Sequence, residues 1–432
     1  MQTKLHLLTA TLLNMLLPVI TYAQFNFTGQ YMNRAEYRHG YGTLSTNNQL
    51  AAFFISQRAR LGAEYVADKY KLVLSAQDIR TWGSTANGTI DAAGLLSIYE
   101  AYGQLIFNKK LNLKLGRQAI SYDDDRIFGS LDWAMQGRRH DAAILQYNDS
   151  TFSAHLGTAY NANGETPSFV QYAVASNYQN FQYLWLNKIR GKFNSSFLFL
   201  NNGVVSSKDA LIAYSQTAGL RTEYKNEKYG AVAYFYYQLG QDAARKTLNA
   251  YAASAEIFYK PVKAAQLTLG GELLTGTSQT DTTTAYKNEN HSFNPLYGTN
   301  HRFNGYMDYF YVGNHVNSVG LIDLYFKACY THKKLLSSVN VHHFEAAAPV
   351  KDKSSANPTT AMNAILGTEI DITFSYNISD NVALQAGYSQ MFGSSTLVAL
   401  RGGQLAQSSN WTYASVLIRP GKNKWPKTGL KM

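Results

Sequence analysis

The sequence predicts an all-β protein: a closed antiparallel transmembrane β-barrel of about 18 strands, with short periplasmic turns and long extracellular loops. Three observations predict this class. Apolar and polar residues alternate along segments of about ten residues, as in strands with one face toward lipid and one toward a polar lumen. The connections between these segments are alternately short and long. Beyond residue 23 no run of 18 apolar residues occurs, so no transmembrane helix is expected.

Residues 1–23 have the pattern of a signal peptide, which is removed from the mature protein. Lys4 gives a positive start, 5–20 is mostly apolar, and Ala23 is a small residue at the expected cleavage point. The alternative is an uncleaved N-terminal anchor. The expected organisation is a signal peptide at 1–23, an outer-membrane β-barrel at 24–420 and a basic C-terminal tail at 421–432.

The period-two pattern is clear from the first mature segment, where Phe25 and Phe27 alternate with Asn26 and Thr28. The segments 53–65 and 369–375 repeat it. A helix would need apolar residues three and four positions apart, and these segments lack them. The whole chain gives 18 candidate strands, at about 25–38, 50–65, 70–80, 96–108, 111–119, 140–148, 151–160, 177–190, 193–201, 210–225, 228–239, 247–260, 263–276, 317–332, 335–345, 362–377, 381–392 and 410–419.

The connections between these strands fall into two classes. Eight are short turns, and between them lie longer loops at 39–49, 81–95, 120–139, 161–176, 202–209, 240–246, 277–316, 346–361 and 393–409. This asymmetry is typical of an outer-membrane barrel in a Gram-negative bacterium, and an even strand count places both termini on the periplasmic side. The alternative, a soluble β-sandwich, would not impose the rhythm so evenly.

Composition narrows the possible functions. The 32 Tyr, 21 Phe and 5 Trp suit strands and membrane–water boundaries. The single cysteine, Cys329, rules out an intrachain disulfide framework. A net charge of +11 in an exported chain indicates anionic lipid headgroups or an anionic solute. Because no nucleic-acid-binding or cofactor motif is present, we expect neither partner.

Several short motifs resemble those of the alginate export porins. They are Arg117-Gln118 at a strand end, Leu131-Asp132-Trp133 in the next loop, His301-Arg302-Phe303 with Gly305, Val341-His342-His343-Phe344, and Gly367-Thr368-Glu369-Ile370-Asp371. The resemblance spans most of the mature chain and includes the strand number. It implies an outer-membrane channel with an arginine-lined constriction that passes an anionic polysaccharide. The loops differ from those of the family in length and composition. The resemblance therefore supports the fold more strongly than the identity of the solute.

Fixed positive charge along the lumen would select a polyanion. Strand parity places Arg34, Arg58, Arg60, Arg221 and Lys327 on the inner face, together with Glu64, Glu223, Glu256, Glu272, Glu369 and Asp371. The family motif adds Arg117 and Gln118 to this path, and Arg138 and Arg139 close the 120–139 loop, which is long enough to fold inward. The alternative for each inward arginine is an ion pair with a carboxylate of a neighbouring strand, which stabilises the wall and does not contact the solute.

The expected function is passive export or diffusion of an anionic polysaccharide or oligosaccharide. The alternatives are a general or small-anion porin, a receptor that uses the 277–316 loop, and an outer-membrane enzyme; no spacing of Ser, His and Asp singles out a triad, so we expect no enzyme. Asp123-Asp124-Asp125 lacks the spacing of a calcium loop, which favours a solvated acidic segment, with Asp125 paired to Arg126, over a metal site. Periplasmic export partners are not identified by the sequence.

Overall fold

The computed structural model describes residues 24–86, 95–168, 172, 177–311, 315 and 317–420. The expected signal peptide at 1–23 and basic tail at 421–432 lie outside these residues. Within them no helix is long and apolar enough to cross a membrane.

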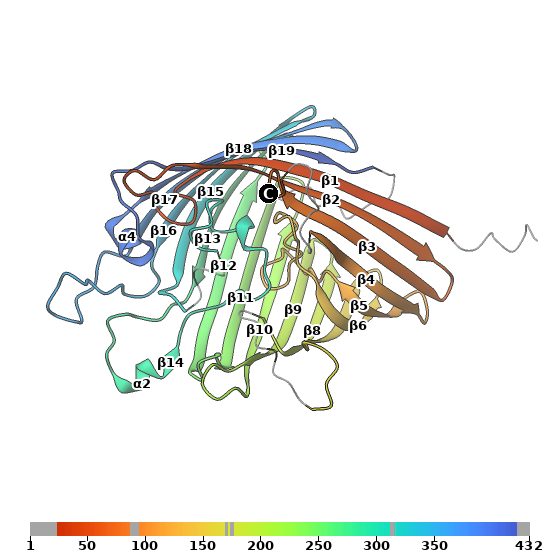
Figure 1. Ribbon diagram of the computed structural model, residues 1–432, viewed down its shortest axis with the longest axis horizontal. Helices are drawn as coiled ribbons and strands as arrows, with labels where there is room; N and C mark the ends of the chain where they lie inside the picture. Colours follow the sequence, from red (N-terminus) through yellow and green to blue (C-terminus); the bar gives the residue numbers. More distant parts are fainter. Residues whose placement is uncertain are drawn as a thin grey trace, which may run out of the picture.

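The chain forms a closed antiparallel barrel of 18 strands, which confirms the predicted fold class (Figure 1). Closure comes from β1, which pairs with both β2 and the last strand, β19. The wall strands are β1 (Gln24–His39), β2 (Ala52–Val66), β3 (Tyr70–Thr81), β4 (Leu96–Ile106), β5 (Leu111–Gln118), β6 (His140–Asn148), β7 (Phe152–Tyr160), β8 (Asn180–Arg190), β9 (Phe193–Val205), β10 (Ile212–Lys225), β11 (Tyr229–Gln241), β12 (Thr247–Tyr259), β13 (Ala265–Leu274), β15 (Leu321–His332), β16 (Leu335–Glu345), β17 (Ile365–Ser379), β18 (Val382–Gly393) and β19 (Ser409–Ile418).

The wall strands place apolar side chains outside, and the inner face carries the buried polar and charged side chains together with apolar side chains that contact the inward chain segments. On β1 and β2, the outward Phe27 and Leu61 are 73% and 74% exposed, whereas the inward Arg58 is fully buried. This inversion of a soluble core follows from the solvent, since lipid covers the outer wall and every backbone group of the wall pairs with a neighbouring strand.

Small residues let large rings lie flat against the inner wall. Five glycines each face an aromatic ring directly across the ladder, and a Cβ on any of them would lie under 2.5 Å from that ring. The pairs are Gly157–Tyr183, Gly219–Tyr236, Gly230–Phe258, Gly270–Tyr325 and Gly387–Tyr413. A ring that covers a glycine fills the space left by the missing side chain.

Replacing Gly387 by valine is expected to destabilise the barrel by about 1–3 kcal/mol, because the new side chain would displace the buried Tyr413 ring. The measurement is the urea midpoint of unfolding in micelles. Gly103→Val is the matched control: its nearest neighbour is a flexible leucine carbon at 3.6 Å, so its midpoint should stay at the wild-type value. Equal midpoints for the two variants would contradict the packing argument.

Two long connections enter the barrel. The first, residues 119–139, is called here the inward loop; the second, residues 291–308 between β13 and β15, is called the inner segment. They meet at an isolated parallel bridge between Phe128 and Tyr297, and their apolar side chains form one buried cluster with rings of the wall. The connection that holds the inner segment also contains the short elements α2 (Thr284–Lys287), β14 (Glu289–Asn290) and η2 (Asn300–Arg302). A further short helix, α4 (Ser395–Arg401), follows β18.

Candidate channel constriction

Wall arginines hold the inward loop. Arg58 on β2 donates to the backbone oxygens of Asp132, Ala134 and Met135 at 3.0–3.3 Å and to Gln30 Oε1 at 2.6 Å. The loop segment 132–135 therefore presents its carbonyl groups to the wall. Since Arg58 is fully buried, no solute can reach it while the loop is in place.

Two neighbouring arginines complete this contact. Arg60 lies 3.3 Å from Asp132 Oδ1, donates to Gln77, and stacks on the Tyr99 ring at 3.4 Å. Arg34 on β1 donates to the Trp133 carbonyl at 2.9 Å and lies 4.2 Å from the centre of its indole ring. The hydrogen bonds fix the loop, and the stacking fixes the indole.

Charge in this region does not cancel. The arginine cluster, defined as Arg34, Arg38, Arg58 and Arg60, faces two carboxylates: Glu36 pairs with Arg34 and Arg38, both at 2.8 Å, and Asp132 pairs with Arg58 and Arg60. Four positive charges against two negative ones leave an excess of +2. In surroundings with little water such an excess acts over a longer distance than at an exposed surface.

The acidic run of the inward loop is tied to the opposite part of the wall. Asp124 lies 3.1 Å from Arg221 Nε on β10, and Arg302 donates to the Asp124 carbonyl at 3.1 Å. Burial raises the pKa of Asp123, whose carboxylate accepts from Trp185 at 3.3 Å. The prediction of a solvated acidic loop was therefore wrong, because these side chains anchor the loop inside the barrel.

Arg126 joins both inward chain segments to β13. Its guanidinium forms an ion pair with Glu272, lies 3.3–3.5 Å from acceptors on Asn300, Asn304 and Tyr234, and stacks over Phe303. Both charged side chains are at most about a twentieth exposed. The expected Asp125–Arg126 pair is also wrong: Asp125 lies 3.7 Å from Arg302 instead.

Carboxylates of β15 and β17 hold the inner segment. Glu369 accepts from the Met307 backbone at 2.8 Å, and Asp323 accepts from Asn304 at 3.1 Å and faces His342 at 3.0 Å. Asp371 accepts from Ser389 on β18. Glu369, Asp323 and Asp371 are all nearly inaccessible. The lumen thus has a basic sector at β1 and β2 and a carboxylate-rich sector at β13–β17, each covered by one inward chain segment.

The other residues predicted for the path lie in separate places. Glu64 pairs with Lys71 at 2.8 Å, and Lys327 lies 4.3 Å from the Tyr325 ring. Gln118 is buried and donates to the Ala142 carbonyl. Arg138 donates to the Gly298 carbonyl at 2.8 Å, and Arg139 to that of Gln136 at 3.3 Å.

Arg117 requires a correction, since the structure does not place it in the lumen. Leu115 and Arg117 share a face of β5, and Leu115 is 42% exposed on the outer wall. Arg117 makes two hydrogen bonds of 2.9 Å to Asp141 on β6, with both side chains exposed. This is a cross-strand pair on the outer face, near the long-loop end.

Arg126, Asn304 and Trp133 are site residues that strand parity did not find. All three lie in connections, where no period applies. The Asp132-Trp133 dipeptide was noticed as a family motif, and it carries the contact to the arginine cluster. Phe293 and Tyr297, aromatic residues of the 277–316 loop, are buried among wall and loop rings.

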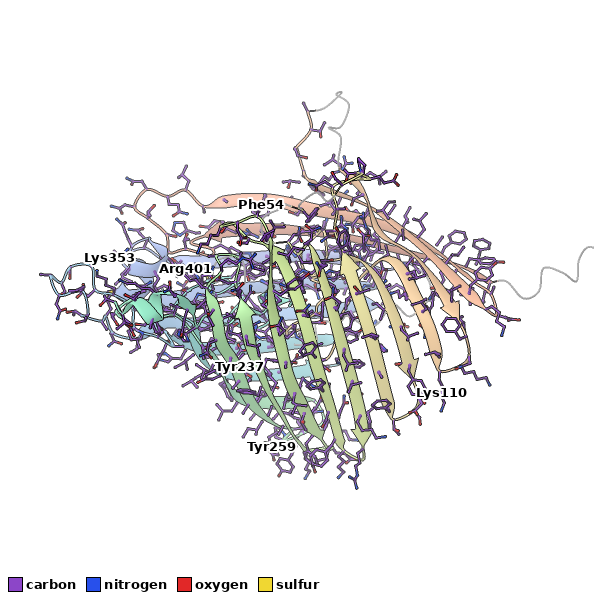
Figure 2. The ribbon with its side chains drawn as sticks, turned by 90° about the horizontal axis from the view of Figure 1, so that it is seen from below. Phe54, Lys110, Tyr237, Tyr259, Lys353 and Arg401 are labelled. Carbon is purple, nitrogen blue, oxygen red and sulfur yellow. The ribbon has the colours of Figure 1, made fainter. Side chains whose placement is uncertain are left out.

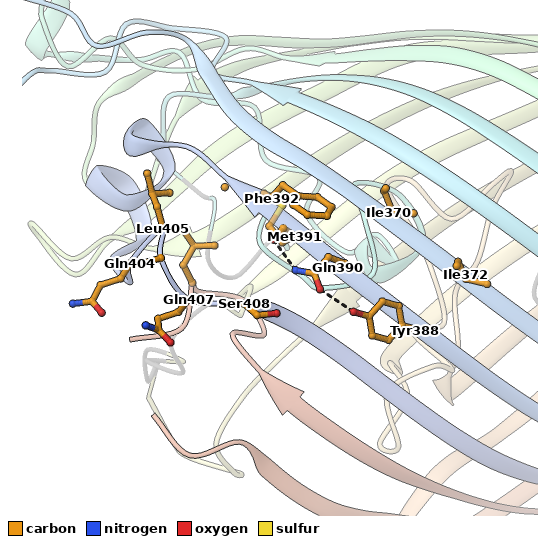
Figure 3. A pocket seen from close by; sticks show the side chains of 13 residues that line it. Ile370, Ile372, Tyr388, Gln390, Met391, Phe392, Gln404, Leu405, Gln407 and Ser408 are labelled. Carbon is orange, nitrogen blue, oxygen red and sulfur yellow. Dashed lines mark hydrogen bonds between the residues drawn. The ribbon is translucent and has the colours of Figure 1, made fainter. Parts of the chain in front are cut away.

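A pocket of about 660 Å³ lies away from the lumen path, between β18 and residues 404–408 (Figure 3). Tyr388 and Phe392 of its lining are exposed on the outer wall. Across the described part of the chain, no group of three or more His, Cys, Asp or Glu side chains is arranged to hold a metal ion.

Comparison with known families agrees with the motif resemblance. The alginate export family model matches residues 23–159. This segment, 137 of the 432 residues, contains β1–β6, all but the last residue of β7, the arginine cluster and the inward loop. The resemblance to the alginate export family is thus confirmed for the part of the chain that builds the basic sector.

Solved barrels resemble nearly the whole chain. OccAB4 of Acinetobacter baumannii superposes with a TM-score of 0.61 at 13% identity, covering 93% of this chain and 99% of its own. OccK9 (OpdG) of Pseudomonas aeruginosa gives 0.61 at 12%, covering 91% and 98%. OpdK of the same organism, solved with vanillate, gives 0.58 at 10%, covering 91% and 98%. At these identities the likeness shows the fold alone. A search of curated proteins found no match.

The closed barrel and its apolar outer wall belong in a Gram-negative outer membrane. The short turns then face the periplasm and the long loops face the outside. Together with the alginate export match, the fold supports an outer-membrane channel.

Proposed function

We propose that this barrel is a passive channel for anionic saccharides, with an anionic polysaccharide or oligosaccharide of the alginate type as its solute. The observation that carries the proposal is the +2 excess of the arginine cluster. This excess lies inside the segment that matches the alginate export family. No catalytic role is assigned to any residue.

The arginine cluster acts in this proposal through its field and through the loop it holds. Arg34, Arg58 and Arg60 are 5%, 0% and 1% exposed, so they do not line an open path by contact. Their charge lowers the energy of an anion passing the inward loop. Arg38, with a third of its side chain exposed, is the member that a solute reaches directly.

The second candidate is a porin for small organic anions. The tight filling of the lumen by two inward chain segments favours it, because such filling narrows the passage for a polymer. OpdK, one of the similar barrels, was solved with vanillate, a small carboxylate. A receptor that uses the 277–316 loop is less well supported, since residues 291–308 of that loop lie inside the barrel.

Planar bilayers distinguish the candidates. The purified protein should give an anion-selective reversal potential across a salt gradient, and oligouronates should interrupt the current in a concentration-dependent manner. Blockade by vanillate-sized carboxylates with none by oligouronates would favour the small-anion porin. A cation-selective or unselective pore would overturn both anion proposals.

A further inference from the structure

Charge is distributed unevenly between the two ends of the barrel. The eight short turns, residues 67–69, 107–110, 149–151, 191–192, 226–228, 260–264, 333–334 and 380–381, contain nine lysines against four carboxylates, a net charge of +5. The nine long connections contain eleven Lys and Arg against twelve Asp and Glu, a net charge of −1. The positive charge of the connections is therefore concentrated at the short-turn end.

Most of the turn lysines are accessible to a ligand. Eight of the nine are exposed, and Lys260 is half-buried. Within the described residues, Lys110 is the turn lysine with a recorded carboxylate contact, at 3.9 Å from Asp149. Three more cations, Lys71, Arg190 and Lys225, stand within two residues of these turns. Lys71 is paired with Glu64, and the remaining cations leave the rim with more positive groups than carboxylates.

Outward aromatic rings adjoin these lysines. Four turn lysines are each next in sequence to a ring that is 40–55% exposed at a strand end: Lys69–Tyr70, Lys192–Phe193, Lys228–Tyr229 and Lys260–Tyr259. Two of these rings, Tyr229 and Tyr259, stack across the ladder at 5.2 Å. Figure 2 shows Lys110 and Tyr259 toward one end of the barrel and Lys353 toward the other.

The lysines and their neighbouring aromatic rings mark the level of the lipid headgroups in the membrane. Exposed Tyr and Phe at strand ends mark the boundary between acyl chains and headgroups. A lysine one residue nearer the turn has a long apolar stem and a charged end, which lets its ammonium reach the lipid phosphates. These lysines lie in the turns, beyond the last outward ring of each strand, so their side chains stand at the level of the lipid headgroups.

We propose that the short-turn rim is a binding surface for anionic phospholipids of the periplasmic leaflet, with Lys69, Lys192, Lys228 and Lys260 contacting lipid phosphates. The neutral, slightly acidic long-loop end has no such preference. The surface holds the barrel at a defined depth and orientation. The proposal depends on the membrane location and not on the transported solute.

Spin-labelled lipids test this directly. The full-length mature protein is reconstituted in phosphatidylcholine, and the motionally restricted fraction is measured for labelled phosphatidylglycerol and labelled phosphatidylcholine. We expect phosphatidylglycerol to be preferred about threefold or more at low salt, and the preference to fall toward one in molar salt. A wild-type preference near one at low salt would overturn the proposal.

Two matched variants locate the surface. Replacing Lys69, Lys192, Lys228 and Lys260 by glutamine should abolish most of the preference. Replacing four loop lysines, Lys208, Lys246, Lys287 and Lys351, by glutamine removes the same charge and should leave the preference unchanged. Heat-dependent gel mobility confirms that each variant is folded, and the salt dependence of the wild type stands without any variant.

Other occupants of the rim give different results. A soluble oligouronate that displaces labelled phosphatidylglycerol from the wild type at equal charge concentration would identify the rim as a solute surface and overturn the lipid assignment. Equal loss of preference in the two lysine variants would also overturn it, because total charge and not the rim would then be responsible.

Discussion

Replacing Arg58 by alanine is expected to release the inward loop and raise the single-channel conductance, roughly twofold or more as the bore widens. Arg58 is fully buried, and its guanidinium serves the Asp132 carboxylate, three loop carbonyls and Gln30. Its loss leaves the three loop carbonyls and Gln30 without this donor, while Asp132 keeps its contact with Arg60. Each buried acceptor left unsatisfied costs about 1–3 kcal/mol. The contacts of Arg34, Arg60 and Gln77 with the loop remain, but they hold it more weakly against β2 without Arg58.

The measurement is conductance in planar bilayers together with limited proteolysis of the intact barrel. In Arg58→Ala, the segment 131–136 should become cleavable, and anion selectivity should fall with the loss of one charge from the cluster. Arg117→Ala is the matched control, since it removes an arginine from the outer face and should change neither conductance nor selectivity. A conductance change in Arg117→Ala, with none in Arg58→Ala, would reverse the assignment of the two residues.

The strands of the barrel wall could be predicted from the sequence because outward and inward side chains alternate with the same two-residue period in each of them. Outward Phe27 and Leu61 and inward Arg58 have the faces that parity predicts. Most strand boundaries lie within four residues of the prediction, because turns with Lys, Asp, Asn or Gly end the pattern. Period two thus supplies the fold, the strand number and the face of most inward charges.

For Arg117, the resemblance to the alginate export family was weaker evidence than the alternation of side chains along β5. Leu113 and Leu115 lie on its face, so parity alone places Arg117 outside, as the structure does. The family motif moved it into the lumen. In this part of the wall, the physical pattern was the better guide.

The content of the lumen could not be predicted in the same way. Residues 119–139 and 291–308 have no period, and their positions depend on partners far along the chain, such as the bridge between Phe128 and Tyr297. Sequence analysis therefore found the inward arginines but not that the inward loop covers them. Because the inward loop covers them, these arginines do not line the path by direct contact with the solute. They hold the loop in place and supply a positive electrostatic field.

The joint between the two inward chain segments leads to the second large expected effect. Arg126→Met should lower the free energy of unfolding by about 3–5 kcal/mol, because the Glu272 carboxylate would stay buried without its cation. Asn304 contacts both Glu272, at 2.6 Å, and Asp323, at 3.1 Å, so the uncompensated charge would disturb the inner segment as well. The urea midpoint of the folded barrel in micelles measures this loss.

Removing the stranded charge should reverse part of the loss. In the Arg126→Met background, Glu272→Gln keeps the shape of the side chain and one acceptor oxygen but removes the buried charge, so the double variant should be more stable than Arg126→Met alone. Arg302→Met is the control arginine of the same region: it is about a quarter exposed and lies 3.7 Å from Asp125, so its loss should cost about 1 kcal/mol or less. If Arg126→Met and Arg302→Met were equally mild, the two inward chain segments would be held by their aromatic packing, and the charged joint would serve only to choose their register against β13.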